Sequence, residues 1–155
     1  MPPLLSPTET LAYSTVRIAV KLQCGSEATG PGFFFSFCRT EATHIPVIVT
    51  NKHVVEGAIS GGFNLTLSSA SGGPSSGHQQ IILTDFPHLW IPHPDPNVDL
   101  TVMQLGPILS QTQLRGFEFF FEPLCKDMIA TSSDLAELSP AEDLLMVGYT
   151  SRGKE

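Results

Sequence analysis

Short apolar segments separated by glycine- and proline-rich stretches constrain the fold of this chain more than any other feature. In Phe63–Leu67 the apolar residues occupy every second position, the pattern of a strand with one buried face. The 155-residue chain contains 13 Gly and 13 Pro, which favour many short strands joined by turns over long helices. Its hydrophobic content of 41% is enough for a packed core. The predicted strands before residue 106 are Tyr13–Gln23, Phe33–Phe37, Val47–Thr50, Phe63–Leu67, Ile81–Leu83 and Leu100–Leu105. Strands this short predict an all-β protein, built as a small closed barrel or a sandwich.

The segments between and after these strands are predicted from their turn residues and apolar runs. Gly25–Gly32 is expected to be a turn and Ser68–Gly77 an exposed Ser/Gly loop. The region from 106 to 125 has no clear period, and its aromatic stretch 117–121 fits either a strand or a connecting segment. Asp134–Leu138 fits a helical turn capped by Ser132 or Ser133, and Leu144–Tyr149 has the composition of a buried strand. A boundary is therefore expected between about 106 and 128, with a second unit beginning after it.

One histidine and one aspartate are placed where a sheet can aim them. His53 follows the apolar strand Val47–Thr50, and Asp99 opens the alternating strand Leu100–Leu105, 46 residues later. A histidine followed by an aspartate at this distance is the chymotrypsin-type order of a Ser-His-Asp triad. In that chemistry the histidine takes a proton from a serine hydroxyl, and the aspartate fixes the tautomer of the imidazole. His53 and Asp99 are therefore the candidate catalytic residues.

Four segments resemble the trypsin-like, chymotrypsin-fold peptidases, especially their bacterial, HtrA-like branch. They are the turn Gly30–Phe34, the histidine motif Ile48–Val55, the aspartate motif Asp99–Leu105 and the second-barrel segment Glu142–Tyr149. The resemblance implies a chymotrypsin-like antiparallel β-barrel over residues 12–106, after a flexible lead-in at 1–11. It also implies an inter-barrel connection at 107–128 and the start of a truncated second barrel at 129–155. The chain departs from the family pattern at Pro31, where Ser or Thr is usual, and at Thr150, where proline is common.

The nucleophilic serine of such a triad is expected outside this chain. In the chymotrypsin-type order it lies roughly 90 residues beyond the aspartate, but 56 residues follow Asp99 and none of them forms Gly-x-Ser-Gly. Gly73–Gly77 matches Gly-x-Ser-x-Gly, yet a nucleophile elbow needs a buried strand before it and a helix after it. Neither is expected around this loop, so Ser75 is rejected. The remaining candidates lack flanking glycines and are interpreted as caps or turn residues; they are Ser132, Ser133, Ser139 and Ser151.

Charge and cysteine usage exclude several other classes. A net charge of −7, with eight scattered basic residues, argues against nucleic acid and anionic membranes as partners. No apolar run approaches the length of a membrane span. No signal-peptide pattern opens the chain, which favours a cytoplasmic location without establishing it. Cys24, Cys38 and Cys125 lack metal-ligand spacing and are expected to be free buried thiols, a Cys24–Cys38 disulfide being the alternative.

Two further histidines lie in a proline-rich segment just before Asp99. His88 and His93, near Asp95, have no helical face on which metal ligands could converge, so a surface loop is favoured over a metal site. The resemblance implies that Trp90 and His93 border the substrate cleft and could form the wall of a subsite. No cofactor is implied, because triad chemistry uses side chains and water alone.

Two functions remain open on this sequence. The first is the N-terminal portion of a trypsin-like serine endopeptidase, acting on polypeptide substrates, whose serine lies beyond residue 155; this chain alone should be inactive. The alternative is a catalytically inactive, single-barrel module that binds or regulates. The presence of both His53 and Asp99 favours the first.

Overall fold

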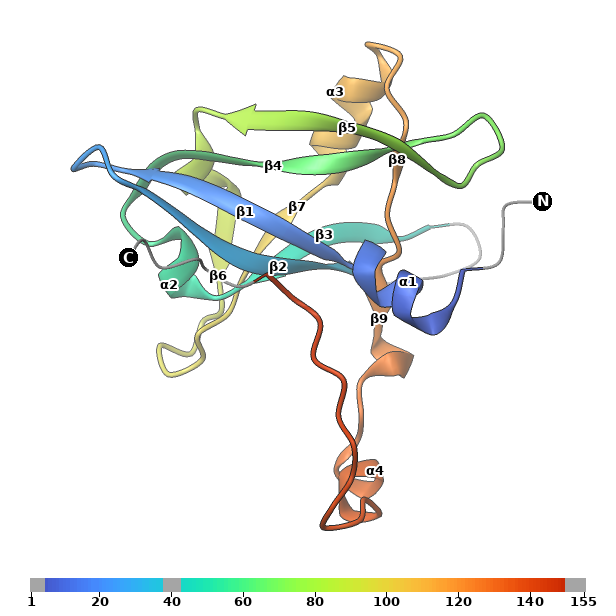
Figure 1. Ribbon diagram of the computed structural model, residues 1–155. Helices are drawn as coiled ribbons and strands as arrows, with labels where there is room; N and C mark the ends of the chain where they lie inside the picture. The colour runs from blue at the N-terminus through green and yellow to red at the C-terminus, as the bar shows by residue number, and fades with distance from the viewer. Residues whose placement is uncertain (1–4, 38–42, 150–155) are drawn as a thin grey trace, which may run out of the picture.

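One curved and mostly antiparallel β-sheet dominates the computed structural model, which describes residues 5–37 and 43–149 (Figure 1). Nine strands in these ranges belong to the sheet. They are β1 (Thr15–Leu22), β2 (Glu27–Phe37), β3 (Ile45–Thr50), β4 (Ala58–Ser68), β5 (Pro74–Leu83), β6 (Trp90–Pro92), β7 (Thr101–Gln104), β8 (Phe119–Phe120) and β9 (Leu124–Cys125). The predicted all-β class is confirmed, and each of the six predicted strands overlaps an observed one.

The strand order is β5-β4-β1-β2-β3-β7-β6, with β8 added beside β4 and β9 beside β2. All pairs in this order are antiparallel, whereas β9 runs parallel to β2. The path is open, because no hydrogen-bonded ladder joins β5 to β6. These two end strands are nevertheless consecutive in the chain, linked by the 3-10 helix η1 (Phe86–Leu89).

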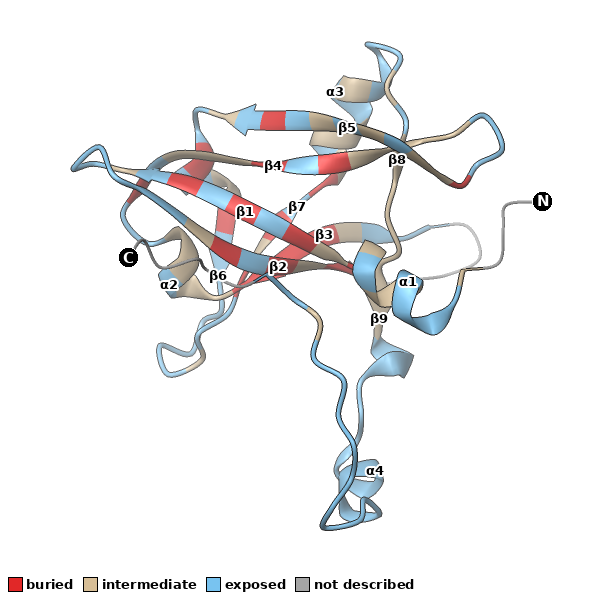
Figure 2. Ribbon diagram, in the orientation of Figure 1, coloured by how far each residue is buried: buried red, intermediate tan, exposed pale blue. Residues whose placement is uncertain are grey.

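The core lies on the inner face of the curved sheet. Along β1 the inward residues Val16, Ile18 and Val20 are buried while Arg17 and Lys21 are exposed, as the two-residue repeat of a strand requires. Figure 2 shows this alternation of buried and exposed positions along β1. Buried side chains from β1, β2, β3, β4, β5, η1, β6 and β7 belong to a single cluster. The sheet therefore wraps around this core, while a second, smaller buried cluster of Phe35, Val47 and Val49 lies on the other face of β2 and β3.

The segment after β7 crosses the open end of the sheet. Helix α3 (Gly106–Gln113) packs Ile108 and Leu109 on the core. The chain then pairs with β4 through β8 and with β2 through β9. The Tyr13 and Phe120 rings meet edge to face, 5.1 Å between centroids, and Phe119 and Phe121 pack on the core. The aromatic stretch 117–121, for which the sequence allowed either a strand or a connecting segment, is thus a connecting segment that contains the short strand β8.

The N-terminal lead-in contains a helix that the sequence pattern did not predict. Helix α1 (Pro7–Tyr13) begins at Ser6, whose hydroxyl accepts a hydrogen bond from the Glu9 amide while the Glu9 carboxylate accepts one from the Ser6 amide. This reciprocal capping box, with proline at the first helical position, stabilises the start of a helix. Residues 7–11 of the predicted lead-in are therefore helical, and Tyr13 ends the helix instead of opening β1.

Two predicted connections are shorter than expected. The β1–β2 turn ends before Glu27, so Gly30-Pro31-Gly32 lies inside β2, paired with β1. A β-carbon on Gly30 would come within 2.6 Å of the Val54 side chain, so glycine at this position allows close packing rather than a turn. Likewise β5 begins at Pro74, and the predicted Ser/Gly loop shrinks to the residues between Ser68 and Pro74. Strand pairing overrode the turn signals in both places.

The predicted buried strand Leu144–Tyr149 is wrong. Residues 141–149 form no strand, and Leu144, Leu145 and Met146 are 87, 67 and 95% exposed. An apolar run forms a strand only where a neighbouring strand satisfies its backbone. No described strand pairs with this segment, although Tyr149 borders a hollow beside β1 and β4. Together with α4 (Ser132–Ala136) this segment forms an arm that projects from the sheet (Figure 1). The helical turn was predicted correctly, but its cap is Thr131, not Ser132 or Ser133.

Candidate active site

His53 lies in α2 (Lys52–Val55), a single helical turn that follows β3 directly. Two contacts anchor this turn. The buried Thr50 hydroxyl donates a hydrogen bond to the Pro31 carbonyl at 2.7 Å, and Val54 packs against the core above Gly30. Because Val54 faces inward, its neighbour His53 is left on the outer side, where its side chain is 68% exposed.

Asp99 reaches the same place through the pairing of β3 with β7. The register sets Thr50 opposite Thr101, so the residues that follow β3 lie beside those that precede β7. The loop before Asp99 is held by hydrogen bonds from the His93 amide to the Leu100 carbonyl at 2.9 Å and from the Asn97 amide to the Asp95 carboxylate, also at 2.9 Å. The register of β3 against β7 thus brings Asp99 beside His53, although 46 residues separate them in the sequence.

The predicted contact between the two candidate residues is confirmed. His53 Nδ1 and Asp99 Oδ2 are 2.5 Å apart, and the His53 backbone N–H donates to Asp99 Oδ1 at 3.2 Å. Each oxygen of the Asp99 carboxylate is therefore hydrogen-bonded to His53, Oδ2 to the ring and Oδ1 to the backbone N–H. This arrangement fixes both the position and the rotation of the imidazole.

Two further side chains stabilise the arrangement and were not identified from the sequence. The side-chain amide of Asn51 donates a hydrogen bond to the backbone carbonyl of Asp99 at 2.8 Å, and Lys52 Nζ donates one to the backbone carbonyl of Asp95 at 3.0 Å. Lys52 thereby joins α2 to the loop before Asp99. Their proximity to His53 was the only sequence signal, because the partners are backbone carbonyls that no residue pattern reveals.

The electrostatics favour an ionised aspartate. The hydrogen bond from the His53 side chain is the largest influence on the pKa of Asp99 and lowers it below its ordinary value. Desolvation opposes this shift, while the backbone N–H donors of His53 and Lys52 add to it. Since a carboxylate only accepts hydrogen bonds, it orients the imidazole with Nδ1–H toward Asp99 and leaves Nε2 as the free acceptor. Both side chains are substantially exposed, at 68 and 48%, so solvent weakens their attraction.

No hydroxyl in the described part of the chain is hydrogen-bonded to His53. Ser75, the rejected match, lies in β5 and accepts a hydrogen bond from the Gly77 amide at 3.1 Å. The prediction that Ser75 lies in a loop is wrong. The chain continues after it as strand β5 to Leu83 rather than turning into a helix, so the geometry of a nucleophile elbow is absent. Ser132 and Ser133 lie in α4, Ser139 accepts from the Ala141 amide, and Ser151 falls outside the described residues.

The neighbouring aromatic and histidine residues separate into core and surface. Trp90 is buried against Phe86, their ring centroids 5.5 Å apart, so its expected place on the wall of a subsite is wrong. His93 borders an open apolar groove of about 700 Å³ with Phe33, Phe35, Leu100 and Ile129. Among the described residues no three His, Cys, Asp or Glu side chains gather as a metal site.

The two described cysteines, Cys24 and Cys125, are free thiols. Cys24 is exposed at the tip of the β1–β2 turn, which corrects the expectation that it is buried, and Cys125 is half-buried. A hydrogen bond from Ser26 lowers the pKa of the Cys24 thiol. Cys38 lies outside the described residues.

The comparisons with known proteins identify no relative. Neither the family models nor the curated proteins nor the solved structures gave a match. No helix among the described residues is long and apolar enough to cross a membrane. Any function assigned to this chain therefore rests on the geometry of the His53–Asp99 pair and its surroundings.

Proposed function

We propose that this chain is the N-terminal portion of a trypsin-like serine endopeptidase, with His53 as its general base and Asp99 as the acid that orients it. The observation that carries the proposal is the double contact of Asp99 with the ring and the backbone amide of His53. A surface ion pair needs only the ring contact, whereas a catalytic histidine must also be held in one orientation and one tautomer.

The arrangement can perform one half of acyl-transfer chemistry. With Nδ1–H donated to the carboxylate, Nε2 of His53 is free to take a proton from a hydroxyl and return it to the leaving amine. Asp99 remains ionised and stabilises the imidazolium formed in between. The nucleophile would come from polypeptide outside these 155 residues, as would the oxyanion hole and the pocket that selects the peptide substrate.

The fold supports the same proposal through its connectivity. The six ladders of the main strand order place β1, β2 and β3 side by side, and its two end strands, β5 and β6, are consecutive in the chain. A single core lies inside the curve, and η1 contributes its fully buried Phe86 to it. A sheet curled in this way, with its ends joined by η1, is our reason for assigning the finer class, a chymotrypsin-like barrel.

The apolar groove beside Asp99 supports the expectation of a second half. It is lined by Phe33, Phe35, Leu100 and Ile129, opens to solvent and measures about 700 Å³. Exposed apolar surfaces of this kind usually contact another domain or protein. A second barrel seated there would also cover His53 and Asp99, removing the solvent that weakens their interaction.

A non-catalytic role, as a binding or regulatory module, has one observation in its favour. Both members of the pair are exposed, and no hydroxyl among the described residues reaches the imidazole. In this alternative the pair would only fasten α2 to the loop before β7.

Covalent labelling distinguishes the two functions. A longer form of the chain carrying a Gly-x-Ser-Gly segment should react with a fluorophosphonate probe, and His53→Ala in that form should abolish the reaction. Asp99→Asn should reduce it by about 10⁴-fold, because the imidazole then adopts the wrong tautomer. His88→Ala, at an exposed histidine in η1, is the matched control and should leave labelling unchanged.

The 155-residue chain alone should not be labelled. Labelling of this chain at Ser75, or labelling of the longer form that survives His53→Ala, contradicts the proposal. A longer form that folds and is not labelled supports the binding module instead.

A further inference from the structure

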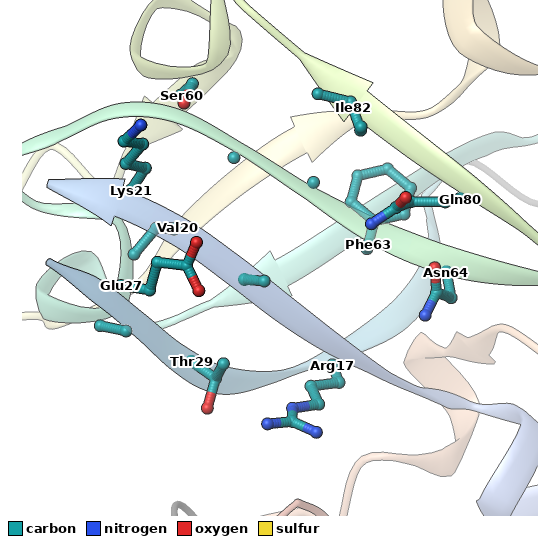
Figure 3. A pocket seen from close by; sticks show the side chains of 14 residues that line it. Arg17, Val20, Lys21, Glu27, Thr29, Ser60, Phe63, Asn64, Gln80 and Ile82 are labelled. Atoms are coloured by element: carbon teal, nitrogen blue, oxygen red, sulfur yellow. The ribbon is translucent and has the colours of Figure 1, made fainter. Parts of the chain in front are cut away.

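A polar hollow lies on the outer face of the sheet, on the side opposite the core. It crosses β1, β2, β4 and β5 and measures about 470 Å³. Figure 3 shows the side chains around it, with Arg17, Lys21, Asn64 and Gln80 among those labelled. His53 and Asp99 do not line this hollow, which is here named the outer trench.

Strand register explains the shape of the outer trench. Ala19 lies opposite Thr29 of β2 on one side and Gly62 of β4 on the other. These small residues form a low row across the strands. Arg17 and Lys21 lie on β1 two residues before and two residues after Ala19. At the rise of a strand, their Cα atoms are about 13 Å apart. The outer trench therefore has a low floor between two walls, each containing one cation.

The floor is low for a structural reason that also fixes it. A β-carbon on Gly62 would lie 2.1 Å from the Ile81 carbonyl oxygen of β5, so no larger residue fits while β4 and β5 remain paired. Ala19 is exposed and has no such constraint. The close approach of two strands thus produces a permanent depression between the walls.

The walls provide unsatisfied cations and amides. The side chains of Arg17 and Lys21 make no hydrogen bond or ion pair within the described residues. Two of the eight basic residues of a chain with net charge −7 therefore flank one hollow without partners. Asn64 and Gln80, opposite one another in the β4–β5 register, add amides that both donate and accept hydrogen bonds. Glu27, opposite Lys21, leaves the outer trench with one net positive charge.

The outer trench continues into a second hollow, which extends the possible contact. Arg17 and Asn64 line both, and the second, of about 400 Å³, adds Tyr13, Thr66 and His78. An extended ligand could therefore contact both hollows, with Arg17 at their junction.

We propose that the outer trench is a docking site for an extended acidic segment of a partner polypeptide. A carboxylate of that segment would pair with the fork of Arg17, a second with Lys21, and its backbone amides with Asn64 and Gln80. The low floor over Ala19 and Gly62 gives the peptide backbone room to lie between the walls. A nucleic acid is disfavoured, because phosphate recognition needs clustered cations. The outer trench has only two cations, Arg17 and Lys21, and the carboxylate of Glu27 lies opposite Lys21. The proposal does not depend on the catalytic role of His53.

Peptide binding to the 155-residue chain tests this site by fluorescence anisotropy. The probe is a dye-labelled octapeptide containing four glutamates, compared with the same peptide carrying glutamines. The glutamate peptide should bind more tightly, and Arg17→Gln should weaken its binding about tenfold, the usual effect of losing a hydrogen bond to a charged group. Ala19→Leu, which raises the floor without changing charge, should weaken it as well.

The matched control is Arg115→Gln, which removes the same charge at an exposed turn after α3 and should change binding less than twofold. Emission from Trp90, the single tryptophan, verifies that each variant is folded. Equal binding of the two peptides, equal losses for Arg17→Gln and Arg115→Gln, or no effect of Ala19→Leu would each overturn the proposal. Tighter binding of a single-stranded 12-nucleotide RNA than of the glutamate peptide would also overturn it.

Discussion

Phe86→Ala, a truncation in η1, should remove more stability than truncation of any aromatic residue of the sheet. Phe86 is fully buried at the start of η1, the segment that links the two ends of the open strand order. Its ring packs edge to face on Trp90 and lies so close to Gly61 that a β-carbon there would be 2.8 Å away. One ring thus contacts β4 and β6 at once.

The expected loss is about 4 kcal/mol, within the roughly 3–5 kcal/mol typical of buried Phe→Ala changes. The upper half of that range applies because the cavity is backed by the β4 main chain at Gly61, which has no side chain that could move into it. A domain with about 5–15 kcal/mol of total stability would lose a large fraction of it. Urea unfolding followed by Trp90 emission measures this loss, because the single tryptophan lies against the altered site. Phe37→Ala, at a 44% exposed ring in β2, is the control and should cost less than about 1 kcal/mol. A loss below about 1.5 kcal/mol for Phe86→Ala would refute the role assigned to η1.

Three other measurements test separate parts of the structure. In a carboxyl-resolved NMR titration, the pKa of Asp99 should lie below its ordinary value of 3.8, and His53→Ala should raise the measured pKa of Asp99. The contact between Asp99 and His53 therefore stabilises the folded state fully above pH 3.8, and this stabilisation is lost as the pH falls through the lower pKa of the folded state. An unchanged pKa in His53→Ala would contradict the hydrogen bond. Gly62→Ala should cost about 1–3 kcal/mol by forcing β4 from β5, whereas Gly106→Ala, with open space around it, should cost far less in the same urea assay. Leu145→Asp should shift stability by less than about 0.5 kcal/mol, since the side chain is 67% exposed; a loss of several kcal/mol would show that this segment is buried after all.

The inner strands could be predicted because burial imposes a two-residue repeat on them. Val16, Ile18 and Val20 face the core and their neighbours do not. This burial produces an alternation of apolar and polar residues that can be recognised in the sequence. The bounds could not be predicted equally well. Gly30 and Gly32 are turn residues by composition but fill positions in β2 where larger side chains would collide with Val54 and Ile18. A sequence alone does not reveal which glycine serves a turn and which serves close packing.

The arm after Cys125 marks the opposite limit. Leu144–Tyr149 has the composition of a strand, but composition provides no partner strand, and the segment remains exposed coil. The short helix α1 was missed for a related reason. Its stability comes from the reciprocal Ser6–Glu9 cap and from the Tyr13–Phe120 contact with a segment far along the chain, neither of which produces a periodic pattern.

The candidate site lies between these cases, because one part of it depends on register alone. Thr50 opposite Thr101 brings the end of β3 beside the start of β7. A one-residue slip would turn every side chain of β7 to the other face, exposing Met103 and breaking the core. The burial of Met103 therefore selects the register that sets Asp99 beside His53. The contact is consequently preformed by the core, without help from a substrate or a second domain, and this explains how two largely exposed side chains can hold a geometry suited to catalysis.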